Sequence, residues 1–182
     1  MLSVIIATHD SERPLVATLA ALVPGATAGV VREVIVADGG SRDETEQVAD
    51  IAGCRFLPSS QPLGARLKAA ADAARGEWLM FLRPGLVPGL GWVEETIAFV
   101  QQAANEPRAA VFASDADGAL AWLSRALSWY PHAEQGLVLQ KSFYAELGGH
   151  RAEASDPETD LVRRIGRSRL TTLRTATARS II

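Results

Sequence analysis

The stretch from Glu33 to Thr45, EVIVADGGSRDET, decides the fold of this chain. Its apolar, β-branched run (34–37) is typical of a buried strand that ends at Asp38, and two glycines follow. Ser41 and Glu44 have the spacing of a capping box at a helix start. A strand that delivers a carboxylate to its carboxyl end beside a glycine turn is typical of nucleotide sites in open α/β sheets. A second interpretation stays open, in which Asp38 only caps its own turn.

Strand and helix patterns alternate along the first half of the chain. Short apolar runs predict strands at Ser3–Thr8, Glu33–Ala37, Cys54–Leu57 and Glu77–Leu82. Helical patterns lie between and after them: three start near Asp10, Asp43 and Pro62, and a fourth carries Val93, Ile97 and Val100 on one face. This order predicts an α/β fold, with a mostly parallel twisted sheet flanked by helices on both faces. The helix from Pro62 is expected to run to Arg75, with that cation in its last turn.

The second half of the chain is less regular. A strand is predicted at Ala109–Ser114, then a leucine-rich helix (120–127), and later a short strand and a helix closed by Gly148 and Gly149. A further helix should start at an Asp156 cap and end at Gly166. The tail (168–177) suits an edge strand with polar residues facing solvent.

Composition limits the classes of function. The formal net charge is -3, so no broad basic field suits nucleic acid, and we expect no nucleic-acid partner. The single cysteine, Cys54, excludes an internal disulfide and most cysteine metal sites. No apolar run approaches the roughly 20 residues of a membrane span, and no signal segment precedes the first strand. We therefore expect one cytoplasmic domain without a transmembrane segment.

Several segments, in this order, resemble family 2 glycosyltransferases. They are SVIIATHDSERPL, VIVADGGSRDET, GARLKAAADAARGEWLMFL, and EQGLVLQKSFYAELGG followed by DLVRRI. The chain is similar to small bacterial members over nearly its whole length, from Leu2 to Thr175. The resemblance implies a Rossmann-like GT-A fold over residues 1–182, with a nucleotide-binding half (1–104) and an acceptor-side half (105–182). It also implies transfer of a sugar from a UDP- or GDP-linked donor to a hydroxyl acceptor that stays unidentified.

The resemblance assigns the donor to residues of the first half. Thr8 would lie against the base or ribose, and Asp38 would accept hydrogen bonds from the base or ribose edge. Asp43 would complete the nucleotide cradle or shape its loop, although an acid at a helix start is equally explained by the helix dipole. Arg66 and Lys68 would face the diphosphate. The alternative for these two cations is a solvated helix face.

The metal-binding motif of the family is missing. Family members usually carry Asp-x-Asp after the strand that ends at Leu82, and its carboxylates hold Mg²⁺ or Mn²⁺. This chain has Arg83 and Gly85 in the two acidic positions. Neither side chain coordinates a cation, so we predict no conventional metal site. Asp115 and Asp117 do spell Asp-x-Asp, but they follow a later strand and are interpreted as a turn and a helix cap.

Three explanations of Arg83 remain open. It could replace the metal by pairing with a diphosphate oxygen as the leaving group departs. Alternatively the site has lost catalysis, which leaves a non-catalytic nucleotide-sugar-binding or scaffold protein on a decayed glycosyltransferase fold. The third explanation is an ordinary surface arginine in a loop ordered by Pro84 and Pro88. A nucleotidyltransferase is a weaker alternative, because the loop after the first strand lacks a glycine-rich basic motif.

On the acceptor side, the resemblance places the general base at Glu158. Its side chain is one methylene longer than the usual aspartate, but it can still accept a proton. An acid in the first turn of a helix explains it equally well. Asp156 is the alternative base and is more simply a helix cap. Glu134, Gln135 and Gly136 match an acidic-Gln-Gly motif that would line the acceptor pocket.

Overall fold

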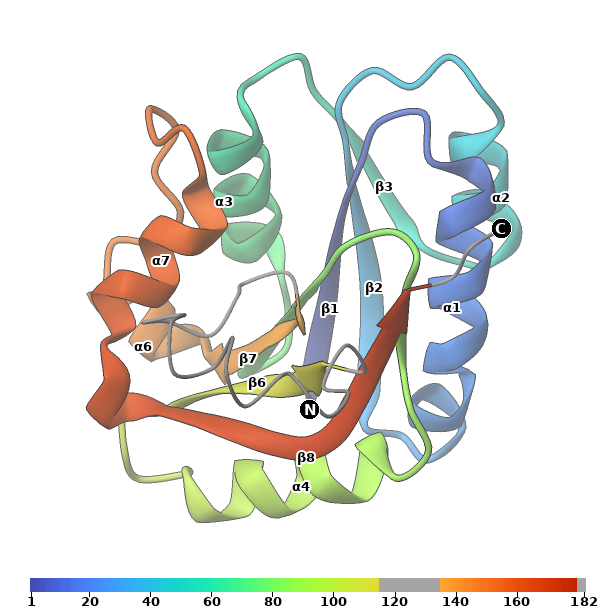
Figure 1. Cartoon of the computed structure of the whole chain (residues 1–182). Coiled ribbons are helices and arrows are strands. Elements are labelled where there is room, and N and C mark those ends of the chain that lie inside the picture. Colours follow the sequence, from blue (N-terminus) through green and yellow to red (C-terminus); the bar gives the residue numbers. More distant parts are fainter. Residues whose placement is uncertain (115–134, 180–182) are drawn as a thin grey trace.

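One mixed sheet forms the centre of the protein. In the computed structural model, which describes residues 1–114 and 135–179, eight strands pair in the order β3-β2-β1-β4-β7-β6-β8-β5 (Figure 1). The first four strands along the sheet are β3 (Arg55–Pro58), β2 (Val31–Asp38), β1 (Leu2–Thr8) and β4 (Trp78–Leu82), all parallel. Their carboxyl ends therefore meet at one edge of the sheet.

Beyond β4 the sheet becomes mixed. β7 (Leu137–Gln140) runs antiparallel to β4 and to β6 (Ala109–Ser114). β8 (Leu170–Arg179) is parallel to β6 and antiparallel to β5 (Leu86–Pro88). The predicted parallel sheet is thus confirmed for the first half, while the second half adds antiparallel strands.

Helices cover both faces, as predicted. Successive residues of a strand point to opposite faces, so Val4 and Ile6 enter one core and Ile5 the other. The first core is closed by α1 (Glu12–Thr27), α2 (Thr45–Ile51) and α4 (Trp92–Gln102), and the second by α3 (Leu63–Ala73), α6 (Lys141–Glu146) and α7 (Pro157–Ile165). Figure 1 shows α3, α6 and α7 on one side of the strands and α1 and α2 on the other.

The start and end of α7 follow the sequence prediction. Asp156 caps it by accepting a hydrogen bond from the backbone N–H of Thr159 at 3.1 Å, and Pro157 occupies the first turn. Two arginines lie in the last turn, and Gly166 follows with a positive φ of 78°. A 3₁₀ turn (167–169) then leads into β8.

Two other predictions about element ends are wrong. α3 ends at Ala73 without a basic residue in its last turn; instead Lys141 Nζ donates to the carbonyl oxygens of Asp72 (3.1 Å) and Ala74 (2.6 Å). The lysine comes from a distant part of the chain, which the local pattern could not show. β8 is not an edge strand over its whole length, because β5, expected to be part of a loop, pairs with its last three residues.

The helices of the described ranges (1–114 and 135–179) include none that is long and apolar enough to cross a membrane.

Candidate functional site

The candidate site lies where the parallel strands end. Thr8 at the end of β1 stands in register with Asp38 at the end of β2, and Ile6 is in register with Leu82, the last residue of β4. Arg83, the next residue, therefore follows β4 at the same edge of the sheet as Asp38, with β1 lying between their two strands. The parallel strands place the donor-side residues and Arg83 along one edge.

Asp38 is buried and organises its own turn. Its Oδ1 accepts hydrogen bonds from the hydroxyls of Thr8 (2.8 Å) and Ser41 (2.5 Å), and its Oδ2 accepts from the backbone N–H groups of Gly40 and Ser41, both at 2.8 Å. Burial opposes ionisation, but these hydrogen bonds outweigh it and hold the pKa of Asp38 below its usual range. Gly40 permits the turn with a φ of 87°. Asp38 therefore caps its own turn as a carboxylate, as the second interpretation proposed.

The predicted capping box at Ser41 and Glu44 is wrong. α2 begins at Thr45, and the Ser41 hydroxyl turns back to Asp38 instead of capping the helix. A capping serine accepts hydrogen bonds from helix N–H groups, whereas the Ser41 hydroxyl is drawn away by the buried Asp38 carboxylate, a strong charged acceptor to which it donates. Ser41 also accepts a hydrogen bond from the backbone N–H of Asp10 at 2.9 Å.

Asp43 joins the two loops that follow β1 and β2. Its Oδ2 accepts from the backbone N–H of Glu12 at 3.0 Å, and its Oδ1 accepts from the backbone N–H of Thr45 at 3.1 Å. The Arg42 backbone N–H in turn donates to Asp10 Oδ1 at 2.7 Å. One carboxylate thus serves the starts of α1 and α2 and shapes the loop. The sequence pointed to Asp10 only as a helix start; it did not show the bond to Arg42 or the positive φ of 46°.

Arg66 lies on the strand ends beside Asp38. Its Nη1 donates to the carbonyl oxygens of Thr8 (3.0 Å) and Ala37 (2.8 Å), and its guanidinium covers Gly39, where a Cβ would be 2.9 Å from Nη1. Burial lowers the pKa of Arg66, and the charge of Asp38 opposes that effect. Lys68 instead lies exposed on α3 and pairs with Asp72 at 3.3 Å, as expected of a solvated helix face. The structure thus brings Arg66, but not Lys68, to the donor-side residues.

Arg83 and Glu158 form an ion pair. Arg83 Nε donates to Glu158 Oε2 at 2.7 Å, and Nη2 contacts the same oxygen. The Arg83 side chain is 36% exposed and that of Glu158 only 12%. Burial raises the pKa of Asp156, but hydrogen bonds from Thr159 and the charge of Arg83 bring it below its usual range. Arg83 is therefore no isolated surface cation, since it lies beside both acids at the start of α7.

The acceptor-side turn contacts the end of β4. Gly136 has a φ of 86°, and a Cβ there would lie 2.8 Å from Leu82 Cδ2 and 3.0 Å from Phe112 Cδ2. The carbonyl oxygen of Gln135, next to it, accepts from Thr177 Oγ1 at 3.4 Å. The turn thus packs beside the residue that precedes Arg83. Glu134, the acidic member of the motif, lies outside the described residues, as do Asp115 and Asp117.

The residues at the end of β4 do not fit a divalent cation. Arg83 carries a positive charge, and Gly85 contributes a backbone N–H that donates to Pro14 O (3.0 Å) and Thr18 Oγ1 (2.9 Å). Hard cations need oxygen ligands in a cluster. Within residues 1–114 and 135–179, no three His, Cys, Asp or Glu side chains lie close enough to hold one.

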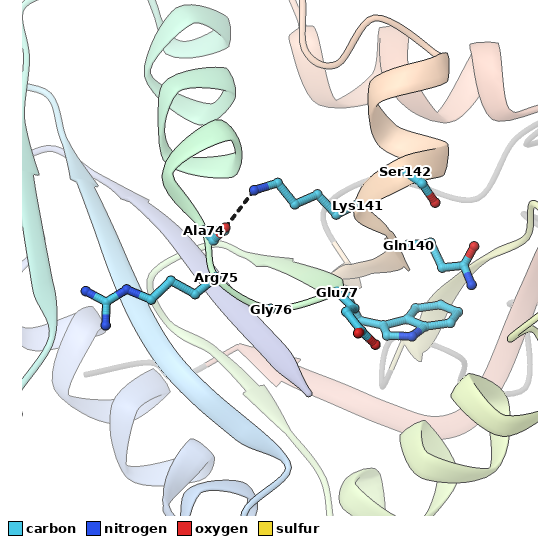
Figure 2. A pocket seen from close by; sticks show the side chains of 8 residues that line it. Ala74, Arg75, Gly76, Glu77, Gln140, Lys141 and Ser142 are labelled. Atoms are coloured by element: carbon cyan, nitrogen blue, oxygen red, sulfur yellow. Dashed lines mark hydrogen bonds between the residues drawn. The ribbon is translucent and has the colours of Figure 1, made fainter.

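Two pockets among the described residues lie away from this edge. One, of about 450 Å³, is lined by residues 74–78 and 140–142 at the amino end of β4. Figure 2 shows Lys141 reaching across this pocket to the carbonyl oxygen of Ala74. The lysine therefore holds the end of α3. The other, of about 650 Å³, lies between α2 and β3 and is lined by acids, Cys54 and Phe56. Neither contains Asp38, Arg83 or Glu158.

Comparison of this chain with known proteins identifies its family. The family model described as glycosyl transferase family 2 matches residues 3–145. No curated protein matches the chain. Among solved structures, glucosyl-3-phosphoglycerate synthase from Mycobacterium tuberculosis, in complex with Mn²⁺, UDP and phosphoglyceric acid, is 18% identical with a TM-score of 0.74. The match covers 100% of this chain and 71% of that chain.

A second solved structure gives the same result. TarS from S. aureus (1–349) is 16% identical with a TM-score of 0.74, over 97% of this chain and 59% of that one. At such identities the likeness shows the fold alone, a GT-A sheet flanked by helices. The family-model match covers most of the chain, and this protein therefore belongs to glycosyltransferase family 2.

Proposed function

We propose that the protein transfers a sugar from a nucleotide diphosphate sugar to a hydroxyl acceptor, with Arg83 in the role that a metal ion has elsewhere in the family. One observation carries this proposal. The Arg83 guanidinium follows β4 at the position of the missing acids and lies within hydrogen-bond distance of Glu158, the residue at the base position. A cation for the leaving group and an acid for the acceptor thus lie side by side.

The donor's nucleotide would lie on the loops after β1 and β2. Thr8, Asp38, Asp43 and Arg66 hold these loops in one arrangement through the hydrogen bonds described above. A carboxylate accepts about four hydrogen bonds, and Asp38 already accepts four. We therefore assign Asp38 to fixing the turn on which the nucleotide lies, and a ribose hydroxyl would replace the rotatable Ser41 hydroxyl.

The reaction requires stabilisation of the negative charge on the diphosphate and removal of the proton of the acceptor hydroxyl. As the bond from the sugar carbon to the diphosphate oxygen breaks, negative charge develops on the diphosphate, and Arg83 stabilises it. As the acceptor oxygen bonds to the same sugar carbon, its proton passes to the Glu158 carboxylate. Gln135 and Gly136 would border the acceptor, because their turn packs against the end of β4. Lys68 has no part in this scheme, since it pairs with Asp72.

A second candidate is a protein that binds a nucleotide sugar without transferring the sugar. The observation that favours it is the ion pair itself, because Arg83 and Glu158 neutralise each other in the described structure. The two candidates share the donor site and differ in whether Glu158 accepts a proton.

Calorimetric titration with UDP, GDP and UDP-glucose, each with and without Mn²⁺, tests the proposal. We expect binding without metal that Arg83→Ala strongly weakens and that Arg163→Ala, which removes an exposed arginine from the last turn of α7, leaves unchanged. Binding only with Mn²⁺ would contradict the role of Arg83. Glu158→Gln should slow sugar transfer to water about 100-fold or more; an unchanged rate would leave the binding protein as the better account.

A further inference from the structure

We infer that the donor's diphosphate takes Arg83 from Glu158, so that donor binding releases the base for the acceptor. This inference rests on the proposed function and adds an order to it, with the donor bound before the acceptor proton can be removed. Three features of the pair lead to it: the geometry of the contact, the charges around it, and the unequal freedom of its two side chains.

The contact places two donors of Arg83 on one of the two carboxylate oxygens of Glu158. Both Nε and Nη2 of Arg83 point at the same oxygen, Glu158 Oε2. A carboxylate that accepts two charge-assisted hydrogen bonds holds its negative charge strongly and has little tendency to take up a proton. In this arrangement Glu158 is a poor base, and it becomes a better one when the guanidinium moves away.

The local charges make simultaneous pairing unfavourable. Arg83 lies beside two acids, because Glu158 contacts it directly and its charge also acts on Asp156. A donor diphosphate adds about two further negative charges to the same cation. Like charges at such distances repel, and the repulsion is strong where water is partly excluded. The diphosphate therefore competes with Glu158 for Arg83.

The two side chains differ in their freedom to respond. Glu158 is buried in the first turn of α7, which Asp156 caps and Pro157 stiffens. The Arg83 side chain is 36% exposed, and Pro84 restricts the backbone conformations of Arg83, so we expect the side chain to move more readily than the backbone. Donor binding should therefore rotate the arginine and leave the acid in place, ready for the acceptor.

Titration of UDP into matched variants tests the exchange. Glu158→Gln removes the competing charge and should tighten the Kd about two- to fivefold, the range of a partly exposed ion pair. Glu146→Gln removes an exposed acid of α6 and should leave the Kd unchanged. Arg83→Ala should weaken binding at least about tenfold, and the double variant should bind as weakly as Arg83→Ala, because the gain acts through Arg83.

The outcomes separate the exchange from the proposed function. Equal or weaker UDP binding by folded Glu158→Gln, with Arg83→Ala still deficient, overturns the exchange and leaves the function standing. Absence of UDP and GDP binding in the wild type overturns both. Should Glu158→Gln fail to fold in a thermal melt, the wild type decides the matter by NMR. The Arg83 Nε–H signal should shift on saturation with UDP, and an unchanged signal overturns the exchange.

Discussion

Replacing Asp38 by asparagine tests whether this carboxylate organises the turn that follows β2. The substitution keeps the size of the side chain and removes its charge. The amide oxygen can still accept from the backbone N–H groups of Gly40 and Ser41, which point at Oδ2 in the wild type. The amide nitrogen would then face the hydroxyls of Thr8 and Ser41, which can rotate and accept.

The magnitude follows from these contacts. A hydrogen bond to a charged group contributes about 1.5–3 kcal/mol and a neutral one about 0.5–1.5 kcal/mol. The two backbone donors each lose about 1 kcal/mol, and the rotating hydroxyls lose little. We therefore expect Asp38→Asn to lower the free energy of unfolding by about 2 kcal/mol. Asp38→Ala, which leaves the same donors without an acceptor, should cost about 3–4 kcal/mol.

Urea denaturation at several pH values gives the test. The pKa of Asp38 is lower in the folded protein, so its contribution is fully present above the unfolded pKa of about 4 and is lost as pH falls through the folded pKa. The gap between wild type and Asp38→Asn should be constant from pH 8 to 5 and shrink below about pH 4. Other titrating groups cancel in this comparison. A gap under about 0.5 kcal/mol at pH 7, or one that grows on acidification, would refute the assignment of Asp38 to the turn.

Two further stability predictions concern glycine and histidine. Gly136→Ala should destabilise the protein by about 2–3 kcal/mol in chemical denaturation, since it adds a clash with Leu82 Cδ2 to the strain of a positive φ. The control is Gly148→Ala, which has the same kind of φ (78°) but open space around it, and should cost only about 1 kcal/mol. Equal losses in the two variants would contradict the close packing at Gly136. Burial lowers the pKa of His150, whose Nδ1 shares a hydrogen bond with the Tyr144 hydroxyl, to about 3. The unfolded chain therefore binds the proton first, so stability should fall by up to about 1.4 kcal/mol per pH unit below about pH 6.5, and His150→Gln should remove that slope.

The fold was predictable because local patterns and global topology agree in the first half. Its apolar runs are too short for helices and alternate with helical patterns, which predicts a parallel sheet. Continuous apolar runs also predict strands that are buried on both faces, and β1 and β4 are buried in this way. The same reasoning could not find β5. Three residues with a proline carry almost no strand signal, and their pairing with β8 depends on a segment more than eighty residues away in the sequence.

For the candidate site, the sequence could suggest residues but not their contacts. Glu158 and Arg83 stand 75 positions apart, and family likeness assigned one to the acceptor and the other to the donor. Only coordinates show that they pair. Likewise, the helical pattern alone does not separate Arg66 from Lys68 as candidate ligands of the diphosphate. The packing of α3 on β1 and β2 places Arg66 at the strand ends and leaves Lys68 in solvent.

Under the proposed function, the absence of acids after β4 and the presence of the Arg83–Glu158 ion pair belong to one arrangement. A divalent cation contributes positive charge to a site only when it is bound, and acidic side chains are needed to bind it. Arg83 brings its charge permanently, and a permanent, partly buried cation needs an anion whenever the donor is absent. Glu158 supplies that anion. Under the proposed function, the cation in the place of the metal would also restrain the base, so the site would need no chelatable ion but would need its donor before it could act on an acceptor.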